Sequence, residues 1–420
     1  MILILFTNSY PYDFSTERTF LAREIPYLTT TIERIIIVPK LVRGNLLSYP
    51  SNVEIDEGFS VFYKKNIRFF LRLFLRTIRS PYFYNEIITK PSLLIKPIKL
   101  AKLILFLGRA EITKTWTIAR IDTLEKKDKK IVLYSYWFDD ISMGLSLVKQ
   151  EKPSIRLISR AHGYDIYEEL YFPYYWPLRR DNLNALDKLF LASEDGREYF
   201  RKRYPEYQEI FETAHLGVDD PGFLSNASND GVLRIVSCAH IVALKRIGLL
   251  LEAIALAAKL RPEQRFEWYH FGDGKERSKL QQKITRLFPP NAEGIMPGFV
   301  PNANVMLHYK TKPVDVFVNL STTEGGAPVS IQEAISCGIP VIATNVGGNP
   351  EIVSSERNGI LLDPNPTPGE VAQALLTICD NPNKVLQMRE ESRRLWEREY
   401  NAKNNFYTFA NRLRKIGYSE

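Results

Sequence analysis

Short apolar runs rich in β-branched residues alternate with longer amphipathic stretches along almost the whole chain. The runs are continuously apolar, which indicates that both faces of each strand are covered, as in parallel sheets with crossover helices. The strands predicted in this way are Met1–Phe6, Arg34–Val38, Ile131–Tyr134, Arg156–Ser159, Lys188–Ala192, Leu233–Cys238, Arg265–Phe271, Val314–Asn319 and Pro340–Thr344. Amphipathic helices are predicted between them, for example at Ile247–Lys259 and Gly369–Cys379. We therefore expect an α/β fold.

One polar segment divides this pattern into two regions. Ser225–Gly231 has neither apolar periodicity nor bulky side chains, so it is predicted to link two α/β domains. The expected domains are residues 1–225 and 226–394. Ligands of open parallel sheets bind where the carboxyl ends of the strands meet, so two such domains facing each other predict a binding cleft.

Composition excludes several other classes of protein. With 420 residues, 45% hydrophobic and 25% charged, the chain has the make-up of a globular protein and not of a disordered or collagen-like one. Its three cysteines form no C-x-x-C pair, which argues against a disulfide framework or a zinc site and favours a reducing compartment. Met1–Phe6 is too short for a signal peptide, and no apolar run approaches the ~18 residues of a membrane span. A cytoplasmic protein is expected.

The net charge of +8 comes from one part of the chain. Between Ser60 and Lys130 there are 17 Lys and Arg against 5 Asp and Glu, so we expect a local anionic partner rather than nucleic acid. Within this part, the segment NIRFFLRLFLRTIR places four arginines within about 80° of one helix face. The members of this arginine stripe are Arg68, Arg72, Arg76 and Arg79. The stripe is either the solvated face of a packed helix or a contact with the anionic inner face of the cytoplasmic membrane.

Several nucleotide-binding motifs are missing from the sequence. No Walker sequence is present, and Gly272-Asp273-Gly274 lacks the third glycine of the dinucleotide fingerprint. Gly272 and Gly274 are predicted first of all to form a turn after the preceding strand. No D-x-D tripeptide is present either, which argues against a metal held by paired aspartates at a diphosphate.

The segment 314–353 carries the strongest candidate site. Its predicted order is strand, small-residue loop, helix, strand, tight glycine turn at Gly347-Gly348 and helix. The first helix is expected to start near Val329 or Ser330, and the free amides and positive end of such a helix bind anions. Glu324 at the loop mouth and Glu333 in the helix can accept hydrogen bonds from sugar hydroxyls, although Glu333 alone could be an ordinary acid near a helix N-terminus. The pattern predicts a site for a nucleotide diphosphate with polyols on either side.

As a set, the motifs resemble those of glycosyltransferase family 4, the retaining nucleotide-sugar enzymes of GT-B fold, and in particular members that build bacterial capsule, lipopolysaccharide or exopolysaccharide. The segments that carry this resemblance are SYPYDFSTERTFLAREIPYL, YSYWFDD, SRAHGYDIYEELY, LDKLFLASEDG, SCAHIVALKRI, HFGDG, GFVPN and the run from Glu324 to Val353. The resemblance implies two Rossmann-like domains whose parallel sheets face each other across a cleft. It also implies that the C-terminal segment 395–420 crosses back to the first domain.

The resemblance assigns roles in donor binding. Glu333 would hold the donor ribose, Glu324 would face the donor sugar, and Lys245, otherwise a solvated lysine, would neutralise the diphosphate. The other residues implied on the donor side are Gly325, Gly326, Ala327, Pro328, Val329, Ser330, Gly272, Gly298, Phe299 and Val300, with His240 and Arg246 near Lys245.

The sequence departs from the family pattern at two points. Glu324 and Glu333 have eight residues between them, where seven are usual. His240 occupies a position where many members carry an arginine that grips the diphosphate. Either Arg246 compensates for that arginine, or the diphosphate is held with less fixed charge.

Residues that follow the predicted strands of the first domain form the expected acceptor side. The resemblance implies that His162 contacts the donor sugar or the reacting centre, although a lone histidine is also a common structural residue. Tyr136, Trp137, Asp139 and Asp165 either bind the acceptor or are core aromatics and capping acids. The loop Thr7–Glu17 is expected to line the same cleft.

The activity implied is transfer of a sugar from a nucleotide-diphosphate sugar, UDP being favoured over GDP, to a hydroxyl of a growing, lipid-linked cell-surface glycan with retention. No metal or other cofactor is expected. No protein nucleophile with a paired base is evident, so catalysis by positioning and by stabilising the departing diphosphate is expected. The alternatives are a nucleotide-sugar epimerase or hydrolase of the same fold, or a non-catalytic membrane-associated scaffold.

Overall fold

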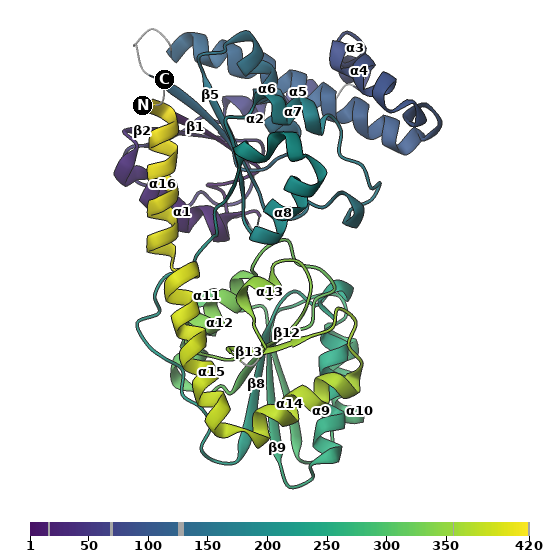
Figure 1. The fold of residues 1–420 in the computed structure, drawn as a ribbon, viewed down its shortest axis with the longest axis vertical. Coiled ribbons are helices and arrows are strands. Elements are labelled where there is room, and N and C mark those ends of the chain that lie inside the picture. The colour runs from purple at the N-terminus through teal and green to yellow at the C-terminus, as the bar shows by residue number, and fades with distance from the viewer. Residues whose placement is uncertain (16, 68–69, 125–129, 356, 419–420) are drawn as a thin grey trace. The chain divides into compact units, whose positions relative to one another are not determined.

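The computed structural model describes residues 1–420 except 16, 68–69, 125–129, 356 and 419–420 (Figure 1). It divides into two units, of which unit 1 comprises residues 1–216 and 403–420 and unit 2 comprises residues 217–402. The boundary thus precedes the predicted linker Ser225–Gly231, which belongs to unit 2. The reason is hydrogen bonding within that unit, since the Ser225 amide donates to the Cys337 carbonyl at 2.9 Å and the Ser228 hydroxyl donates to Asp315 at 2.7 Å.

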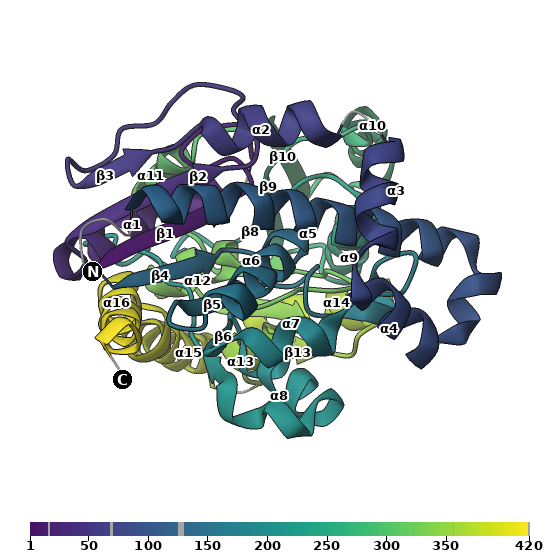
Figure 2. The same cartoon turned by 90° about the horizontal axis from the view of Figure 1, so that it is seen from above.

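Unit 1 is built on a seven-stranded sheet in which all neighbouring strands are parallel. In spatial order the strands are β3 (Val53–Ile55), β2 (Arg34–Pro39), β1 (Ile2–Thr7), β4 (Ile131–Ser135), β5 (Arg156–Ala161), β6 (Lys188–Leu191) and β7 (Phe211–Thr213). Successive residues of β1 enter different core clusters, because side chains alternate between the two faces of a strand. Ile4 packs with the cluster that includes α2 (Gly58–Ile67) and α5 (Pro97–Leu124), and Leu5 packs with the cluster of α1 (Arg18–Thr31). The sheet is therefore the middle layer of three (Figure 2).

A group of further helices completes unit 1. These are α3 (Phe70–Ile78), α4 (Pro81–Thr89), η1 (Pro91–Ile95), α6 (Asp140–Glu151), η3 (Glu168–Leu170), α7 (Arg179–Ala185), α8 (Glu194–Arg203) and η4 (Pro205–Ile210). Both views place α3 and α4 beside α5 and away from the strands (Figures 1 and 2). Helices α2 to α5 all come from the basic stretch between β3 and β4.

The predicted arginine stripe is divided in the structure. Arg68 lies outside the described residues, and Arg72 and Arg79 are exposed. Arg76 is half-buried, and its guanidinium donates to Asn66 Oδ1 at 3.4 Å. Burial lowers the pKa of Arg76, which is the direction expected when a charge leaves water. The stripe is therefore not one evenly exposed cationic face.

Unit 2 contains a six-stranded parallel sheet. Its spatial order is β10 (Ala292–Gly298), β9 (Arg265–Phe271), β8 (Val232–Cys238), β11 (Val316–Asn319), β12 (Val341–Thr344) and β13 (Gly359–Leu362). The helices are η5 (Ala243–Lys245), α9 (Ile247–Leu260), α10 (Arg277–Leu287), α11 (Asn302–Thr311), α12 (Val329–Ser336), α13 (Asn349–Ile352), α14 (Pro368–Asp380) and α15 (Pro382–Leu395). Ile235 packs in the cluster of α9 and α14, and the next residue, Val236, packs in that of α11 and α12. Unit 2 therefore also has helices on both faces of its sheet.

The C-terminal segment is interrupted and is not one helix from residue 395 onward. A π-helical turn, η6 (Trp396–Tyr400), follows α15, and α16 (Ala402–Tyr418) then packs on the sheet of unit 1 through Phe409 and Leu413 (Figure 1). The amide of Val218 donates to the Tyr400 carbonyl at 3.0 Å, and the Ala402 amide donates to the Val218 carbonyl at 3.1 Å. These bonds hold residues 400–402 in unit 2, so the chain leaves that unit later than predicted.

The predicted α/β fold with parallel sheets is confirmed. All nine predicted strands are present, with ends that differ by a few residues. Four further strands, β3, β7, β10 and β13, were not predicted, and each lies at an edge of its sheet. No helix within the described ranges is both long enough and apolar enough to cross a bilayer.

Candidate functional site

The loop between β11 and α12 presents open main-chain amides. Helix α12 begins at Val329, and no side chain caps its N-terminus at Pro328. The amides of Val329 and Ser330 have no acceptor among the described residues. Because the first amides of a helix and its dipole both favour negative charge, this end of α12 can bind a phosphate group.

Glu324 lies in the same loop, and one of its carboxylate oxygens is fully engaged. Oε1 accepts hydrogen bonds from Ser321 Oγ at 2.6 Å and from Asn319 Nδ2 at 3.2 Å, and it forms an ion pair with Lys245. Oε2 has no partner in the described part of the chain and is not buried. The structure thus brings the predicted pair Glu324 and Lys245 together and leaves one carboxylate oxygen for a ligand hydroxyl.

The turn at Gly347-Gly348 packs directly against this loop. Gly347 has a φ of +50°, and a Cβ on it would lie 1.7 Å from the Glu324 carbonyl oxygen. A Cβ on Gly348 would lie 2.3 Å from the Gly326 carbonyl carbon. Since real Cβ atoms do not approach backbone so closely, both glycines are required where the two segments meet. The turn after β12 therefore fixes the position of the loop that enters α12.

Arg246 is engaged by main-chain groups of neighbouring loops. Its guanidinium donates to the carbonyls of Leu320 at 2.6 Å, Ser321 at 2.8 Å and Pro364 at 2.7 Å, and to Asn365 Oδ1 at 3.3 Å. A guanidinium has five N–H donors, so little of its capacity remains for a diphosphate. Arg246 is therefore poorly placed to replace the arginine that many family members carry at the position of His240, which favours a diphosphate held with less fixed charge. The side-chain cation at the loop mouth is Lys245.

His240 lies in the loop after β8, and Phe299 and Val300, which the resemblance implies on the donor side, directly follow β10. His240 is exposed, Phe299 is 66% exposed, and Val300 is partly exposed. A Cβ on Gly272, which has a φ of +147°, would lie 1.8 Å from the Ala239 carbonyl oxygen. The ends of β8, β9 and β10 are therefore packed backbone to backbone, and the turn after β9 begins at Gly274, whose carbonyl accepts from the Arg277 amide at 3.1 Å.

Glu333 lies in the second turn of α12 and is 6% exposed. Burial raises the pKa of the Cys238 thiol to about 12, and the nearby carboxylate of Glu333 adds to this effect. Since Cys238 ends β8, Glu333 lies near the carboxyl edge of the sheet. Among the described residues, no group of three His, Cys, Asp or Glu side chains gathers as a metal site.

In unit 1, His162 lies among aromatic rings after β5. The ring centroids of Tyr136 and Trp137 are both 4.5 Å from that of His162, and Phe20 is 6.2 Å away. Burial lowers the pKa of His162 well below its ordinary value, and Arg160 adds to the shift, so the imidazole is neutral near pH 7. Neither ring nitrogen has a hydrogen-bond partner within the described ranges. The side chain is partly exposed, but both nitrogens are buried, so neither offers surface for a hydrogen bond with a ligand.

The structure corrects most of the acceptor-side assignments in unit 1. Asp165 is fully buried and accepts from the amides of His162 at 2.8 Å, Gly163 at 3.0 Å and Phe138 at 3.0 Å. Asp139 is 5% exposed and caps α6 by accepting from the Ile141 amide at 2.9 Å. Tyr136 is also fully buried. Tyr136 and Asp165 have no surface to offer an acceptor, and both carboxylate oxygens of Asp139 already accept hydrogen bonds, from Ile141 and Tyr164. These three residues are therefore structural. Trp137 alone of the four remains partly exposed.

Some residues that organise the site were not predicted. Glu17 is buried and accepts from the amides of Asn8, Ser9 and Tyr10 at 2.8–3.0 Å and from Trp137 Nε1 at 2.7 Å. It therefore joins the loop after β1 to the end of β4. In unit 2, Asn319 and Ser321 hold Glu324 in the same way. Their only sequence signal is their position, since polar residues directly follow the apolar strand β11.

The comparisons with known proteins bear first on unit 2. Residues 223–395 match the family model described as glycosyl transferases group 1. The chain is 30% identical over 253 residues to the UDP-N-acetylglucosamine–peptide N-acetylglucosaminyltransferase GtfA subunit of Streptococcus agalactiae, covering 57% of this chain and 48% of that protein. The chain thus spans about half the length of this relative.

Solved structures resemble the chain over almost its full length. The lipopolysaccharide outer core galactosyltransferase WaaB matches with a TM-score of 0.69 at 14% identity, covering 98% of this chain and 99% of that one. HepE of Anabaena in complex with UDP matches with a TM-score of 0.63 at 16% identity, covering 99% of each chain. At such identities the likeness shows the fold. Residues 223–395 therefore carry the sequence pattern of a group 1 glycosyl transferase, in a chain whose two parallel-sheet, Rossmann-like units have the GT-B fold.

Proposed function

We propose that the chain is a glycosyltransferase that moves a sugar from a nucleotide-diphosphate donor to a hydroxyl group of a growing glycan. The observation that carries this proposal is the N-terminus of α12. Its open amides at Val329 and Ser330 lie in the same loop system as Lys245 and Glu324, beside a buried Glu333. Groups that bind a phosphate and groups that bind hydroxyls are thus combined at one edge of a parallel sheet.

Each side chain has a role in donor binding that follows from its contacts. The α12 amides and the Lys245 ammonium balance the charge of the diphosphate. Glu324 Oε2 accepts from a hydroxyl of the donor sugar, and Glu333 accepts from the ribose hydroxyls. His162, in unit 1, is proposed to lie beside the reacting sugar.

Catalysis in this proposal consists of positioning and charge stabilisation. When the bond to the anomeric carbon breaks, negative charge grows on the leaving diphosphate, and fixed amides and an ammonium group stabilise that charge without rearranging. Glu324 is held through Oε1 by three donors, which suits it to orienting a hydroxyl rather than to attacking the sugar. Retention of configuration and independence of a metal ion are parts of the proposal.

The donor and acceptor classes rest on the relatives. The Streptococcus agalactiae relative is named for UDP-N-acetylglucosamine, and the HepE structure contains UDP, which supports a UDP-sugar as donor. WaaB is named for the outer core of lipopolysaccharide, and this supports a lipid-linked, cell-surface glycan as acceptor. An anionic membrane at α3, through Arg72 and Arg79, would keep the enzyme near such an acceptor.

The test is a panel of UDP- and GDP-sugars, measured first by calorimetry and then by product analysis with and without a glycolipid acceptor. We expect binding of one UDP-sugar and acceptor-dependent transfer. Free sugar or an epimer as the main product without acceptor would identify a hydrolase or epimerase instead. Absence of binding for every nucleotide would indicate a non-catalytic scaffold and overturn the proposal.

A further inference from the structure

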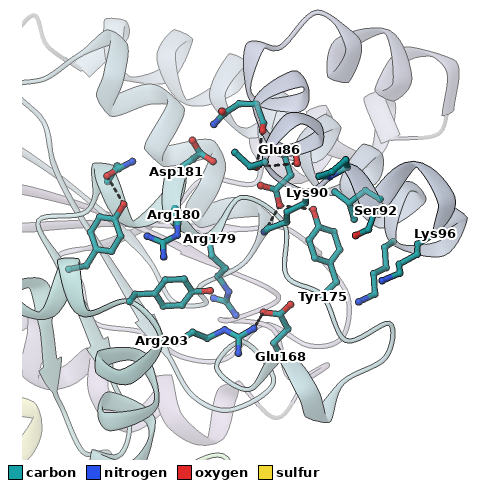
Figure 3. Close-up of a pocket in the computed structure, with 18 residues that line it drawn as sticks. Glu86, Lys90, Ser92, Lys96, Glu168, Tyr175, Arg179, Arg180, Asp181 and Arg203 are labelled. Atoms are coloured by element: carbon teal, nitrogen blue, oxygen red, sulfur yellow. Dashed lines mark hydrogen bonds and ion pairs between the residues drawn. The ribbon is translucent and has the colours of Figure 1, made fainter.

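A pocket lies entirely in unit 1, and none of the residues that line it belongs to the candidate site described above. Its volume is about 890 Å³, and it is lined by residues of α4, η1, α5, η3, α7, α8 and η4 (Figure 3). A cavity of this size can take a small ligand or a lipid head group. Three of the elements that line it, α4, η1 and α5, come from the basic stretch between β3 and β4.

Cationic side chains predominate in the wall of this pocket. They are Lys90, Lys96, Lys99, Arg179, Arg180 and Arg203, against the acids Glu86, Glu168 and Asp181. Two of the acids are already neutralised, since Glu86 pairs with Lys90 at 2.8 Å. Glu168 pairs in the same way with Arg203 at 2.8 Å. The remaining charge is therefore mainly positive.

Three of the cations have no carboxylate partner. Lys96 is exposed and makes no hydrogen bond or ion pair among the described residues, and Figure 3 shows it across the pocket from Arg179. Lys99 donates to the main-chain carbonyl of Tyr174 at 2.9 Å. Arg179 is 5% exposed, and its guanidinium donates to two main-chain carbonyls. The buried charge of Arg179 has no carboxylate within ion-pair distance among the described residues, which is unfavourable, so an anion in the pocket would be stabilised by Arg179. The exposed Lys96 and the half-buried Lys99 would add to the attraction.

A lysine beside the pocket is affected by the same positive charge. The Lys102 ammonium lies 4.2 Å from the ring centroid of Trp176. Burial lowers the pKa of Lys102 to about 8, and the charge of Arg179 contributes to the shift. A neighbouring cation makes protonation of a lysine less favourable, which agrees with an uncompensated charge in this region.

The elements that form the pocket also carry exposed aliphatic side chains. Ile88 on α4 and Ile95 on η1 are 77% and 80% exposed, and Leu94 and Ile98 are each more than half exposed. Lys90 and Lys96, which line the pocket, alternate with them along the sequence. Aliphatic groups interleaved with lysines at a surface are typical of contact with a lipid, because the chains and the phosphate are satisfied together.

From the cationic pocket and its aliphatic surroundings we propose that it binds the phosphate group of an anionic phospholipid. The phosphate lies between Lys96, Lys99 and Arg179, and the exposed aliphatic side chains contact the acyl chains. A soluble phosphate ester would use the cations but would leave Ile88 and Ile95 without a role. The inference concerns a site other than α3 and does not depend on the proposed transferase activity.

The test is co-sedimentation of the full chain with vesicles of phosphatidylcholine alone or mixed with phosphatidylglycerol. We expect binding only to the mixed vesicles. The double variant Lys96→Gln/Lys99→Gln should weaken it roughly thirtyfold, since each lysine near an anionic surface contributes about 1 kcal/mol. Ile88→Ser/Ile95→Ser should weaken it on the order of tenfold through lost apolar contact. Soluble glycerol phosphate should compete more strongly than sodium chloride of equal ionic strength.

Matched controls keep the result interpretable. Lys259→Gln/Lys415→Gln removes two exposed lysines that lie outside the pocket. Leu260→Ser/Leu307→Ser removes two exposed leucines as the control for the isoleucine variant. Both control variants should bind vesicles as the wild type does. Glu333→Ala should also bind vesicles normally, which separates this inference from the donor site. Equal binding to both vesicle types, or wild-type binding by Lys96→Gln/Lys99→Gln, would overturn it. Glycerol phosphate binding without vesicle binding would replace the lipid with a soluble ligand and equally overturn it.

Discussion

At the scale of single residues, the donor site depends on a few contacts that hold polar groups in place. Glu324 is oriented by Ser321, Asn319 and Lys245, and the loop around it is fixed by a glycine turn. In the described part of the chain, the amides of Val329 and Ser330 and one carboxylate oxygen of Glu324 are left open. This division between engaged and open groups is what lets a short loop bind one ligand in one orientation.

Glu333→Ala tests the proposed ribose contact. A charged acceptor contributes roughly 1.5–3 kcal/mol, so donor affinity should fall about ten- to hundredfold, as measured by calorimetry with the donor nucleotide. The variant should still melt close to the wild-type temperature, because a small apolar side chain replaces a buried acid. Glu390→Ala, at an exposed position, is the control and should bind normally. Wild-type donor affinity in Glu333→Ala would remove the residue from the site.

Gly347→Ala tests the close approach of the glycine turn. Its Cβ would meet the Glu324 carbonyl oxygen, so the loop must shift, and donor affinity should fall together with stability. Gly222→Ala is matched, since Gly222 also has a positive φ, of +71°, but no atom within 4 Å of the added Cβ. Its free energy of unfolding in urea should fall by only about 1 kcal/mol, the cost of placing an alanine at a positive φ, and its nucleotide affinity should not change. Equal behaviour of the two variants would contradict the argument.

Asp139 gives a prediction on pH. Burial raises the pKa of Asp139 to about 7, and Asp140 adds to the shift, so the folded chain holds a proton that the unfolded chain releases near pH 4. The contribution of Asp139 to stability therefore falls as the pH rises from about 4 to 7. Asp139→Asn, which can still cap α6, removes this dependence. The urea midpoint of Asp139→Asn minus that of the wild type should be larger at pH 8 than at pH 5.

A second acid provides the control for this experiment. A hydrogen bond from Arg234 lowers the pKa of Asp230 to about 2, so both folded and unfolded chains are ionised there between pH 5 and 8. The difference in urea midpoint between Asp230→Asn and the wild type should therefore stay constant from pH 5 to pH 8. If the Asp139→Asn difference is equally flat, Asp139 is ionised in the folded chain and the assigned shift is wrong.

At the scale of elements, the strands that the sequence predicted and those it missed have different environments. Most central strands bury both faces and read as continuous apolar runs, whereas β9, with the sequence RFEWYHF, alternates between buried and half-buried positions. The four that were missed are edge strands, and β3, with the sequence VEI, and β10, with AEGIMPG, carry charged or small residues. An edge strand buries less of its surface, and its pairing is decided by a neighbour distant in sequence.

The division of the predicted arginine helix has the same cause. The periodicity gave four arginines on one face, but Arg76 turns toward Asn66 of α2 while Arg72 and Arg79 remain exposed. Which part of a cationic face is solvated depends on the helices packed beside it, and no local pattern contains that information.

Arg72→Gln/Arg79→Gln tests whether α3 contacts an anionic membrane. Binding to vesicles containing phosphatidylglycerol should weaken by about 1 kcal/mol per arginine, and the loss should disappear at high salt. Glycerol phosphate should compete with wild type and variant alike, since α3 does not line the pocket. If the variant binds vesicles as well as the wild type does at low salt, the arginines of α3 are only a solvated helix face and do not contact the membrane.

At the scale of the whole molecule, two units with separate cores share one chain that passes between them twice. Residues 217–218 and 400–402 are hydrogen-bonded to each other inside unit 2, where a Cβ on Gly217 would lie 2.6 Å from Ala402 Cα. The residues proposed to bind the nucleotide all lie in unit 2, so nucleotide binding should first stabilise that unit.

Hydrogen exchange with and without UDP measures this effect. A ligand at one hundred times its Kd adds about 2.7 kcal/mol to the folded state that binds it, so exchange should slow in residues 217–402, most of all around α12. Glu333→Ala should lose most of this protection at the same UDP concentration. Protection confined to unit 1 would place the nucleotide elsewhere and contradict the donor site.

The sequence by itself determined the α/β class, the central strands and the start of α12, because apolar runs and the small-residue loop before the helix are local patterns. It also placed Glu324, Lys245 and Glu333 in one candidate site. Only the tertiary structure decided that Asp139 caps α6, that Asp165 binds the amides of two loops, that Arg246 donates to neighbouring loops, and where unit 1 ends. These outcomes depend on contacts between residues far apart in the chain, and the burial and partners of a polar group exist only once those contacts have formed.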